Sequence, residues 1–226
     1  MCVSGIILVT GCSVMASRLL WEQEVLGSNP STPTIRKGNL KIILMRHGSF
    51  ENPDHIYPGR LAGYHLSEFG REQVIRAAKM MKTNDIRKIY SSPLARTLET
   101  AKILAQEIGL DENDIEIKDD LIEMDLPELE GKPMVDFNKS SYAKDPLGEK
   151  DGESMRQAGK RIFDFLQKII GDNQNVVVVS HSDPITGAVA LIKSDGQGYK
   201  RGKIEKGSFF TIDTVKNPWE VKYTRV

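Results

Sequence analysis

Three short apolar runs, each followed at once by a turn and a helical pattern, constrain the fold of this chain most strongly. They lie at residues 40–45, 86–90 and 175–179, and runs of this length with β-branched side chains are typical of buried strands. Strands that alternate with helices are joined by long crossovers and form a mostly parallel sheet. We therefore predict an α/β fold, a three-layer sandwich with a mostly parallel central sheet and helices on both faces.

Hydrophobic periodicity places the other elements. Helices are expected at 67–82 and 93–108, with Ser67 and Ser92 as their N-caps. The inward face of the first helix would comprise Phe69, Val74, Ala77, Ala78 and Met81. Further helices are predicted at 153–170 and 184–192, and further strands at 115–117, 209–213 and 221–225. The last two strands are predicted to form an antiparallel edge of the sheet.

Each of the three apolar runs also delivers a cationic or titratable side chain to one edge of the sheet. The first run ends in Arg46-His47-Gly48, the second leads to Arg96 in the first turn of a helix, and the third leads to His181. In α/β folds, ligands bind at the carboxyl edge of the sheet. A guanidinium neutralises phosphate oxygens and an imidazole can attack phosphorus, so the pattern indicates phosphoryl-transfer chemistry.

Several segments, in this order, give the chain a resemblance to a known family. It resembles the histidine phosphatase superfamily, the phosphoglycerate-mutase-like group, and within it the smaller phosphatase branch. The resemblance covers about residues 40–226, and we expect a histidine phosphatase domain over 39–226. The segments that carry it are Leu-Met-Arg-His-Gly at 44–48, Ser-Ser-Pro-Leu-x-Arg-Thr-x-Glu-Thr-Ala at 91–101, Leu-Ile-Glu-Met-Asp-x-x-x-x-Glu-Gly at 121–131, Asp-Gly-Glu-Ser at 151–154 and Val-Val-Ser-His-Ser-Asp at 178–183.

The resemblance implies a role for individual residues. His47 would be the nucleophile that forms a phosphohistidine, and Glu123 would donate a proton to the leaving oxygen. Arg46, Arg96 and His181 would line the phosphate pocket, with His181 protonated while phosphate is bound. A carboxyl group must begin protonated to act as an acid, so we expect burial to raise the pKa of Glu123. No metal or other cofactor is expected, because the cationic side chains take the place of magnesium.

The chain departs from the family pattern at several positions. Asn52 falls one position short of the usual phosphate-contacting asparagine, and Arg60 lies in a loop that could reach the substrate, so both are retained as candidate substrate-binding residues. The family's Gly-x-Trp-Glu-Gly is Pro-Glu-Leu-Glu-Gly here, at 127–131, which leaves Glu123 as the favoured acid. Asp183 is a rival for that role, although we favour its reading as the N-cap of the helix that follows.

Three functions are compatible with these residues. The leading one is a metal-independent phosphomonoesterase that acts on a small phosphorylated metabolite through phosphohistidine. The alternative is a 2,3-bisphosphoglycerate-dependent phosphoglycerate mutase, and the third is an inactive phospho-ligand-binding module. True mutases of the family carry an arginine-rich insertion, whereas segment 125–150 contains no arginine, which counts against a mutase. In that segment Phe137, Tyr142 and Lys144 are candidate substrate contacts, with surface packing as the alternative.

The first 38 residues differ in character from the rest. They hold both cysteines, Cys2 and Cys12, and the apolar segment 3–16 lacks the basic residues that begin a signal sequence. Residues 20–35 resemble a transfer-RNA gene translated in one frame. We therefore expect a non-native or disordered N-terminal extension over 1–38 that contributes no core. The absence of a transfer-RNA sequence upstream of codon 36 would refute this hypothesis.

Composition limits the partners. Lysine and arginine number 31 and aspartate and glutamate 31, a balance that argues against a nucleic-acid-binding surface. The expected partner is a small phosphorylated substrate, with no membrane contact, and a homodimer is left open. The absence of cysteine after Cys12 fits a reducing cytoplasm, which is the expected location. His55 and His65 stand beside no cysteine or carboxylate at ligand spacing, so we expect no metal site.

Overall fold

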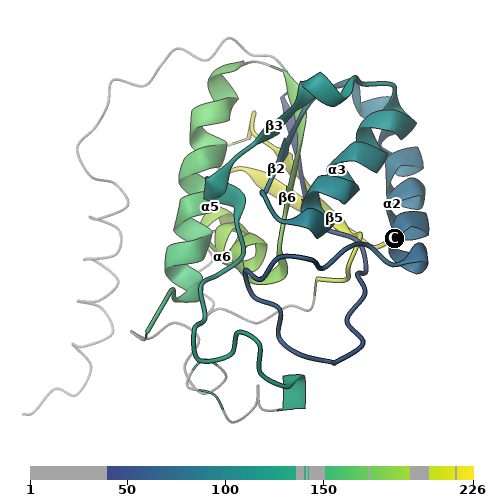
Figure 1. Ribbon diagram of the computed structural model, residues 1–226. Helices are drawn as coiled ribbons and strands as arrows, with labels where there is room; N and C mark the ends of the chain where they lie inside the picture. Colours follow the sequence, from purple (N-terminus) through teal and green to yellow (C-terminus); the bar gives the residue numbers. More distant parts are fainter. Residues whose placement is uncertain are drawn as a thin grey trace, which may run out of the picture. The chain divides into compact units, whose positions relative to one another are not determined.

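A six-stranded sheet forms the centre of the fold, with the strand order β3-β2-β4-β1-β5-β6 (Figure 1). Strand β1 pairs with β4 in parallel, and β2 is parallel to both β3 and β4. The β1–β5 and β5–β6 pairs are antiparallel, which confirms the predicted antiparallel edge. The strands are β1 (Lys41–Arg46), β2 (Ile86–Ser91), β3 (Ile115–Ile117), β4 (Asn175–Ser180), β5 (Phe209–Asp213) and β6 (Glu220–Thr224).

The computed structural model of the protein describes residues 40–135, 140, 142, 151–172, 174–193, 204–216 and 218–226. The extension predicted for 1–38 lies outside these residues, as do Phe137 and Lys144. Tyr142 is described, and its side chain is buried in a small apolar cluster with Met124 and Met155.

Alternate residues of β1 face opposite layers of the molecule. Ile42 and Leu44 pack in the core formed with helices α5 and α6, whereas Ile43 and Met45 pack in the core formed with α2 and α3. This follows from the two-residue period of a strand, and all four side chains are fully buried. Figure 1 shows the two helix pairs on opposite sides of the sheet, so the predicted α/β three-layer fold is confirmed. The helices are α2 (Glu68–Met81), α3 (Ala95–Ile108), α5 (Met155–Ile169) and α6 (Ser182–Lys193).

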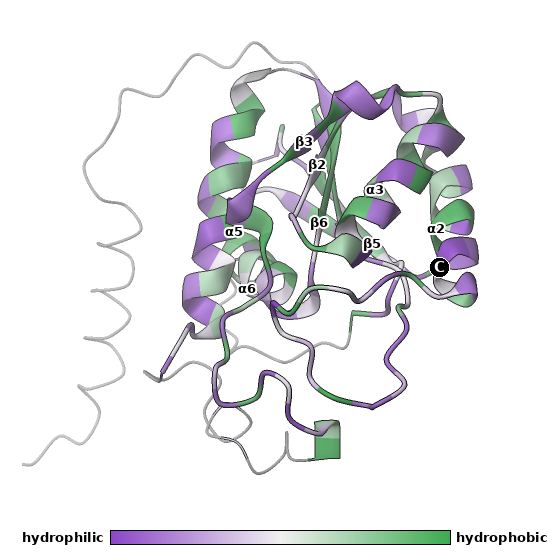
Figure 2. Cartoon of the chain, in the orientation of Figure 1, coloured by the Kyte–Doolittle hydropathy of each residue, from purple (hydrophilic) through white to green (hydrophobic). Residues whose placement is uncertain are grey.

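The helices are amphipathic, and α2 and α5 begin at capping serines. Figure 2 shows hydrophilic and hydrophobic residues on the same helices, the pattern expected of helices that cover a sheet. As predicted, Ser67 caps α2, since its side chain accepts a hydrogen bond from the Gly70 amide. Ser154 and Gln157 form a reciprocal capping box at the start of α5.

Helices α5 and α6 approach each other at a pair of glycines. A Cβ atom on Gly159 of α5 would lie 2.3 Å from the backbone carbon of Gly187 in α6, and a Cβ on Gly187 would lie 2.8 Å from the Gly159 Cα. The two backbones therefore touch at this crossing. Because α6 begins directly after His181, this contact also fixes the strand–helix turn that carries that histidine.

We expect Gly159→Ala to lower the free energy of unfolding by about 1–3 kcal/mol, because the added methyl group overpacks a crossing without free space. Urea unfolding followed by circular dichroism measures this change. Gly171→Ala is the matched control, since a Cβ there would meet no atom within 4 Å. Equal free energies of unfolding for the two variants would contradict the prediction, because α5 and α6 would then accommodate the methyl group without loss of stability.

Three local predictions are wrong. The Phe69 side chain is 58% exposed rather than turned inward, because it lies outside the apolar stripe of α2. Helix α3 begins at Ala95 with Leu94 at the N-cap position, so Ser92 is not its cap. Asp183 is the second residue of α6 and not the residue before it, so the N-cap reading of Asp183 fails as well.

Candidate active site

The parallel strands β1, β2 and β4 end side by side at one edge of the sheet. In the parallel register Arg46 at the end of β1 is aligned with Ser180 of β4, and Ser91 of β2 is aligned with Val179 of β4. The residues that follow are His47, Ser92 and His181, and all three side chains are buried. The predicted delivery of chemically active residues to one edge is thus present in the geometry.

His47 is held in one orientation and in one tautomer. Its ring is 2% exposed, and Nδ1 lies 2.8 Å from the Gly48 carbonyl oxygen, which can only accept a hydrogen bond. Nδ1 therefore carries the proton and Nε2 keeps its lone pair. Burial, followed by the charges of Arg96 and Arg46, holds the pKa of His47 well below its usual value. The imidazole is neutral, which is the state that a nucleophile requires.

His181 lies beside His47, with 5.2 Å between the two ring centroids. A 2.8 Å hydrogen bond joins its Nε2 to the Ser92 hydroxyl, which explains why Ser92 faces the site instead of capping α3. Its Nδ1 is buried without a hydrogen-bond partner and lies 3.6 Å from Oε2 of Glu123. Burial and the nearby charges of Arg96, His47 and Arg46 hold the pKa of His181 well below its usual value, so it too is neutral beside these neighbours.

Two arginines surround the histidine pair. Arg96, in the first turn of α3, is 1% exposed and donates from Nη2 to the Gly59 carbonyl at 2.8 Å. Arg46 donates from Nη1 to the Ile204 carbonyl. In both side chains the buried Nε has no hydrogen-bond partner. Buried guanidinium groups with unsatisfied N–H donors are suited to binding an anion, because an arginine remains charged at any working pH.

The Glu123 carboxyl group lies beside His181. Its Oε1 accepts from the Met124 amide at 2.8 Å, while Oε2 points toward the imidazole. Burial, followed by the negative charge of Asp183, raises the pKa of Glu123 to about 7. A carboxyl group poised near neutrality can both donate and accept a proton. Asp183 is 9% exposed and acts on the site through its charge.

Arg60 lies in the loop as predicted, but its hydrogen bonds are made to protein groups. Its Nε donates to the Glu123 carbonyl at 2.9 Å and its Nη2 to the Glu153 carboxylate at 2.8 Å. Glu153 also binds Arg161, whose Nη1 donates to the Ile122 carbonyl at 3.0 Å. Arg60 and Arg161 therefore hold, by hydrogen bonds, the backbone carbonyl groups of Glu123 and of the residue before it. This network positions the Glu123 side chain, and a substrate contact of Arg60 stays a prediction.

The Asn52 side-chain amide forms two hydrogen bonds to the backbone within its own loop. Its Nδ2 donates to the Ile56 carbonyl at 2.8 Å, and its Oδ1 accepts from the Ile56 amide at 3.2 Å. Both ends of the side chain are thus used locally. A contact between Asn52 and phosphate stays a prediction as well.

Two residues at the site were not foreseen from the sequence. The centroid of the Phe50 ring lies 5.4 Å from that of the His47 ring, and the Lys206 Nζ lies 4.2 Å from the Phe50 centroid. Burial and the charges of Arg46 and Arg96 lower the pKa of Lys206 to about 8. Lys206 lies in a turn far along the chain from the other site residues, and a lone loop lysine carries no sequence signal.

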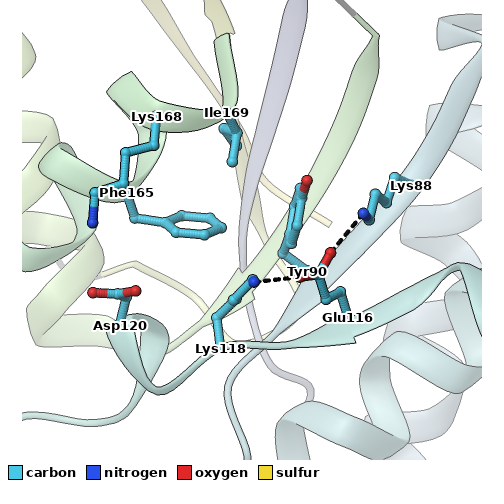
Figure 3. A pocket seen from close by; sticks show the side chains of 8 residues that line it. All are labelled: Lys88, Tyr90, Glu116, Lys118, Asp120, Phe165, Lys168 and Ile169. Atoms are coloured by element: carbon cyan, nitrogen blue, oxygen red, sulfur yellow. Dashed lines mark ion pairs between the residues drawn. The ribbon is translucent and has the colours of Figure 1, made fainter. Parts of the chain in front are cut away.

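Other features of the described part of the chain lie apart from this site. A pocket of about 400 Å³ is lined by residues of β2, β3 and α5. Figure 3 shows its lining side chains, among which Glu116 pairs with both Lys88 and Lys118. None of its lining residues belongs to the histidine site. His65 is paired with Glu99 on the surface. Within the described ranges no three His, Cys, Asp or Glu side chains are grouped as metal ligands, and no helix there is long and apolar enough to cross a bilayer.

Comparison with known proteins agrees with this geometry. A family model described as "Histidine phosphatase superfamily (branch 1)" matches residues 42–225. The chain is 34% identical over 158 residues to phosphoserine phosphatase 1 of Hydrogenobacter thermophilus, covering 65% of this chain and 72% of that protein. It is 29% identical over 180 residues to a 2,3-bisphosphoglycerate-dependent phosphoglycerate mutase of Thermoplasma acidophilum, covering 77% and 86%.

Solved structures share the fold. A mycobacterial glucosyl-3-phosphoglycerate phosphatase superposes with a TM-score of 0.69 at 20% identity, covering 83% of this chain and 98% of that one. The fold and the family model together define a phosphatase-type enzyme with a phosphoglycerate-mutase-like α/β architecture. The chain belongs to the histidine phosphatase superfamily, as its sequence motifs predict.

Proposed function

We propose that this chain is a metal-independent phosphomonoesterase that hydrolyses a small phosphorylated metabolite through a phosphohistidine on His47. One observation carries the proposal: a neutral imidazole of fixed tautomer lies in one buried cluster with two guanidinium groups, a second histidine and a carboxyl group with a pKa of about 7. These are the nucleophile, the charge stabilisers and the acid that phosphoryl transfer requires. The family assignment supports the same reaction class.

The first step transfers the phosphoryl group to the enzyme. The lone pair of His47 Nε2 attacks phosphorus and forms a P–N bond while the P–O bond to the alcohol breaks. Arg46 and Arg96 neutralise the nonbridging oxygens during transfer. Glu123 gives its proton to the leaving oxygen, which departs as the alcohol.

The second step releases phosphate. Water attacks the phosphohistidine, the Glu123 carboxylate takes a proton from that water, and the P–N bond breaks to restore neutral His47. His181 supports both steps once a phosphate dianion offsets the charge of the arginines, because the dianion raises its pKa toward the protonated state. Asn52 and Arg60 remain candidate substrate-binding residues in this scheme.

We also assign a cellular setting and a domain boundary to this function. The catalytic domain corresponds to residues 39–226 and is preceded by an extension that takes no part in the chemistry. Its lack of cysteine supports a cytoplasmic location. Relatives named as phosphatases act on small phosphorylated compounds, which supports a small metabolite as the partner.

A phosphoglycerate mutase is the second candidate, and the Thermoplasma acidophilum relative favours it. The same pocket serves both reactions, and the difference lies in whether water or a phosphoglycerate receives the phosphoryl group. The absence of arginine from segment 125–150 weighs toward the phosphatase, because a mutase must bind a carboxylate and a second phosphate above the site.

Phosphate release from a panel of phosphomonoesters in excess EDTA tests the proposal. The panel contains 3-phosphoglycerate with and without 2,3-bisphosphoglycerate. We expect release that persists in EDTA, with the best substrate identifying the natural class. Interconversion of phosphoglycerates without net release would establish the mutase. No turnover of any compound would leave the inactive binding module as the remaining function.

A further inference from the structure

Glu130 takes no part in the reaction steps above, yet its carboxylate makes a short hydrogen bond beside the site. The residue belongs to the segment Pro-Glu-Leu-Glu-Gly at 127–131. Its Oε2 accepts a hydrogen bond from the backbone amide of Arg60 at 2.6 Å. The Arg60 side chain is engaged elsewhere, by the Glu123 carbonyl and the Glu153 carboxylate. Glu130 therefore binds the backbone of Arg60 and not its guanidinium.

The peptide group between Gly59 and Arg60 links Glu130 to Arg96. Its N–H belongs to Arg60 and donates to the Glu130 carboxylate. Its C=O belongs to Gly59 and accepts from Nη2 of Arg96 at 2.8 Å. The peptide dipole is thus aligned with both charges, and the hydrogen bond to the carboxylate at one end strengthens the bond to the guanidinium at the other. One peptide group therefore joins a carboxylate outside the reaction to an arginine of the site.

This peptide group depends on Glu130 for its orientation, because it follows a glycine. Gly59 has a φ of +47°, and a glycine leaves the peptide after it free to take several orientations. A Cβ atom on Gly59 would lie 2.4 Å from Oε2 of Glu130, so the carboxylate occupies the space that a side chain would need. Without the carboxylate, the Arg60 N–H would lose its acceptor and the Gly59 carbonyl would be free to turn away from Arg96.

The turn that carries Glu130 is fastened to the loop that it holds. The Gly131 amide donates to the Tyr57 carbonyl at 2.9 Å, and the Tyr57 amide donates to the Lys132 carbonyl at 2.8 Å. Within the turn, the Glu130 amide donates to the Leu126 carbonyl at 3.0 Å. The carboxylate is therefore presented from a backbone that is hydrogen-bonded on both sides of it.

The Arg96 guanidinium needs support of this kind. Its Nε is buried without a hydrogen-bond partner in the described part of the chain, and its Cζ lies 5.5 Å from the centroid of the Phe50 ring. A cation–π contact attracts the guanidinium without fixing the directions of its N–H groups. Those directions matter, because an arginine binds phosphate through two parallel N–H bonds. The hydrogen bond from Nη2 to the Gly59 carbonyl supplies the missing direction.

We propose that Glu130 is a positioning residue, which orients the Arg96 guanidinium for phosphate through the Gly59–Arg60 peptide group. The inference rests on the proposed function in naming phosphate as the anion that Arg96 binds. Gly59 is part of the same device, since only a residue without a side chain admits the carboxylate so close to its backbone.

Calorimetric titration of full-length variants with inorganic phosphate tests the proposal by the sign of the change. If charge alone mattered, removing a carboxylate near an anion site would strengthen anion binding. Glu130→Ala is instead expected to weaken phosphate binding about tenfold, the scale of one charge-assisted hydrogen bond. Glu130→Gln keeps an acceptor oxygen and should restore most of the affinity. Asp54→Asn removes an exposed carboxylate from the same loop and should bind phosphate like the wild type.

A second readout follows Arg96 directly. In NMR spectra of isotope-labelled protein, the buried Arg96 Nε–H should give a resolved signal, assigned by its loss in Arg96→Lys. Glu130→Ala is expected to shift this signal in the phosphate-free protein, whereas Asp54→Asn should leave it unchanged. Gly59→Ala, whose methyl group would displace the carboxylate, should reproduce the shift with Glu130 present, and it replaces Glu130→Ala should that variant fail to fold.

The outcomes separate this inference from the proposed function. Equal or tighter phosphate binding in Glu130→Ala would overturn the inference, as would an Arg96 signal that stays in place. Failure of the wild type to bind phosphate would overturn the proposed function instead. The Arg96 signal of the phosphate-free protein decides in that case, too, whether Glu130 orients the guanidinium.

Discussion

His47→Ala is expected to reduce phosphomonoesterase activity by a factor on the order of 10⁴ or more, the scale seen when a covalent nucleophile is removed. The reason is that no neighbouring group can replace it. The Nε2 atom of His181 is hydrogen-bonded to Ser92, and its Nδ1 atom lies beside the Glu123 carboxyl group. Steady-state phosphate release by the purified variant measures the loss.

A direct observation of the intermediate strengthens this test. Wild-type enzyme mixed with substrate and quenched in alkali should retain one phosphoryl group per chain, since phosphohistidine survives alkali and is lost in acid. His47→Ala should retain none. His55→Asn is the matched control, because His55 is exposed with a φ of 49° that asparagine tolerates, and it should label like the wild type. Labelling of His47→Ala would contradict the assignment of the nucleophile.

Glu123→Gln is expected to lower kcat/KM by about 10²–10³ for esters of aliphatic alcohols, because these leaving groups need a proton. The loss should be much smaller for p-nitrophenyl phosphate, whose leaving group departs as a stable anion. The pKa of Glu123 is about 7, and the acid form is the one present below it. Activity toward aliphatic esters should therefore fall as the pH rises through about 7 in the wild type. The Glu123→Gln variant should lack this limb, because an amide does not titrate in that range.

Asp183→Asn distinguishes the two carboxylates. The negative charge of Asp183 raises the pKa of Glu123, so its removal should shift the basic limb of the pH profile to lower pH while leaving most of the activity below that limb. Should Asp183→Asn instead abolish the limb and match the loss expected of Glu123→Gln, Asp183 would be the acid. Measuring both variants with both classes of substrate separates these outcomes.

The fold was predictable because its signals are local. The β-branched runs that became β1 and β4, the Ser67 cap and the alternation of strands and helices each depend on a few neighbouring residues. The failures have a common physical origin in tertiary contacts. Ser92 has the chemistry of an N-cap, but the partner that it finds is His181, which is 89 residues away. Phe69 fits an apolar pattern yet lies over Arg76 on the surface.

In the candidate site, too, the residues with local sequence signals could be predicted, and those that depend on tertiary contacts could not. Arg46, His47, Arg96 and His181 each follow a strand or begin a helix, so their convergence could be predicted from the sheet alone. Arg60 stays a candidate for substrate contact, but its ion pair with Glu153 could not be predicted, because a loop arginine carries no sign of its partner and Glu153 lies 93 residues away. Lys206 was missed because its position depends on a turn fastened to β1 by hydrogen bonds to backbone groups.

The position of β1 in the sheet has a consequence for the order in which the site is assembled during synthesis. Strand β1, which leads into His47, is made early, yet both of its sheet partners, β4 and β5, are made after residue 174. The run that ends in Arg46 therefore emerges from the ribosome with no strand to pair with, and domains with such distant pairings fold slowly. The cluster of His47, Arg96 and His181 can therefore form only after nearly all of the chain has been translated.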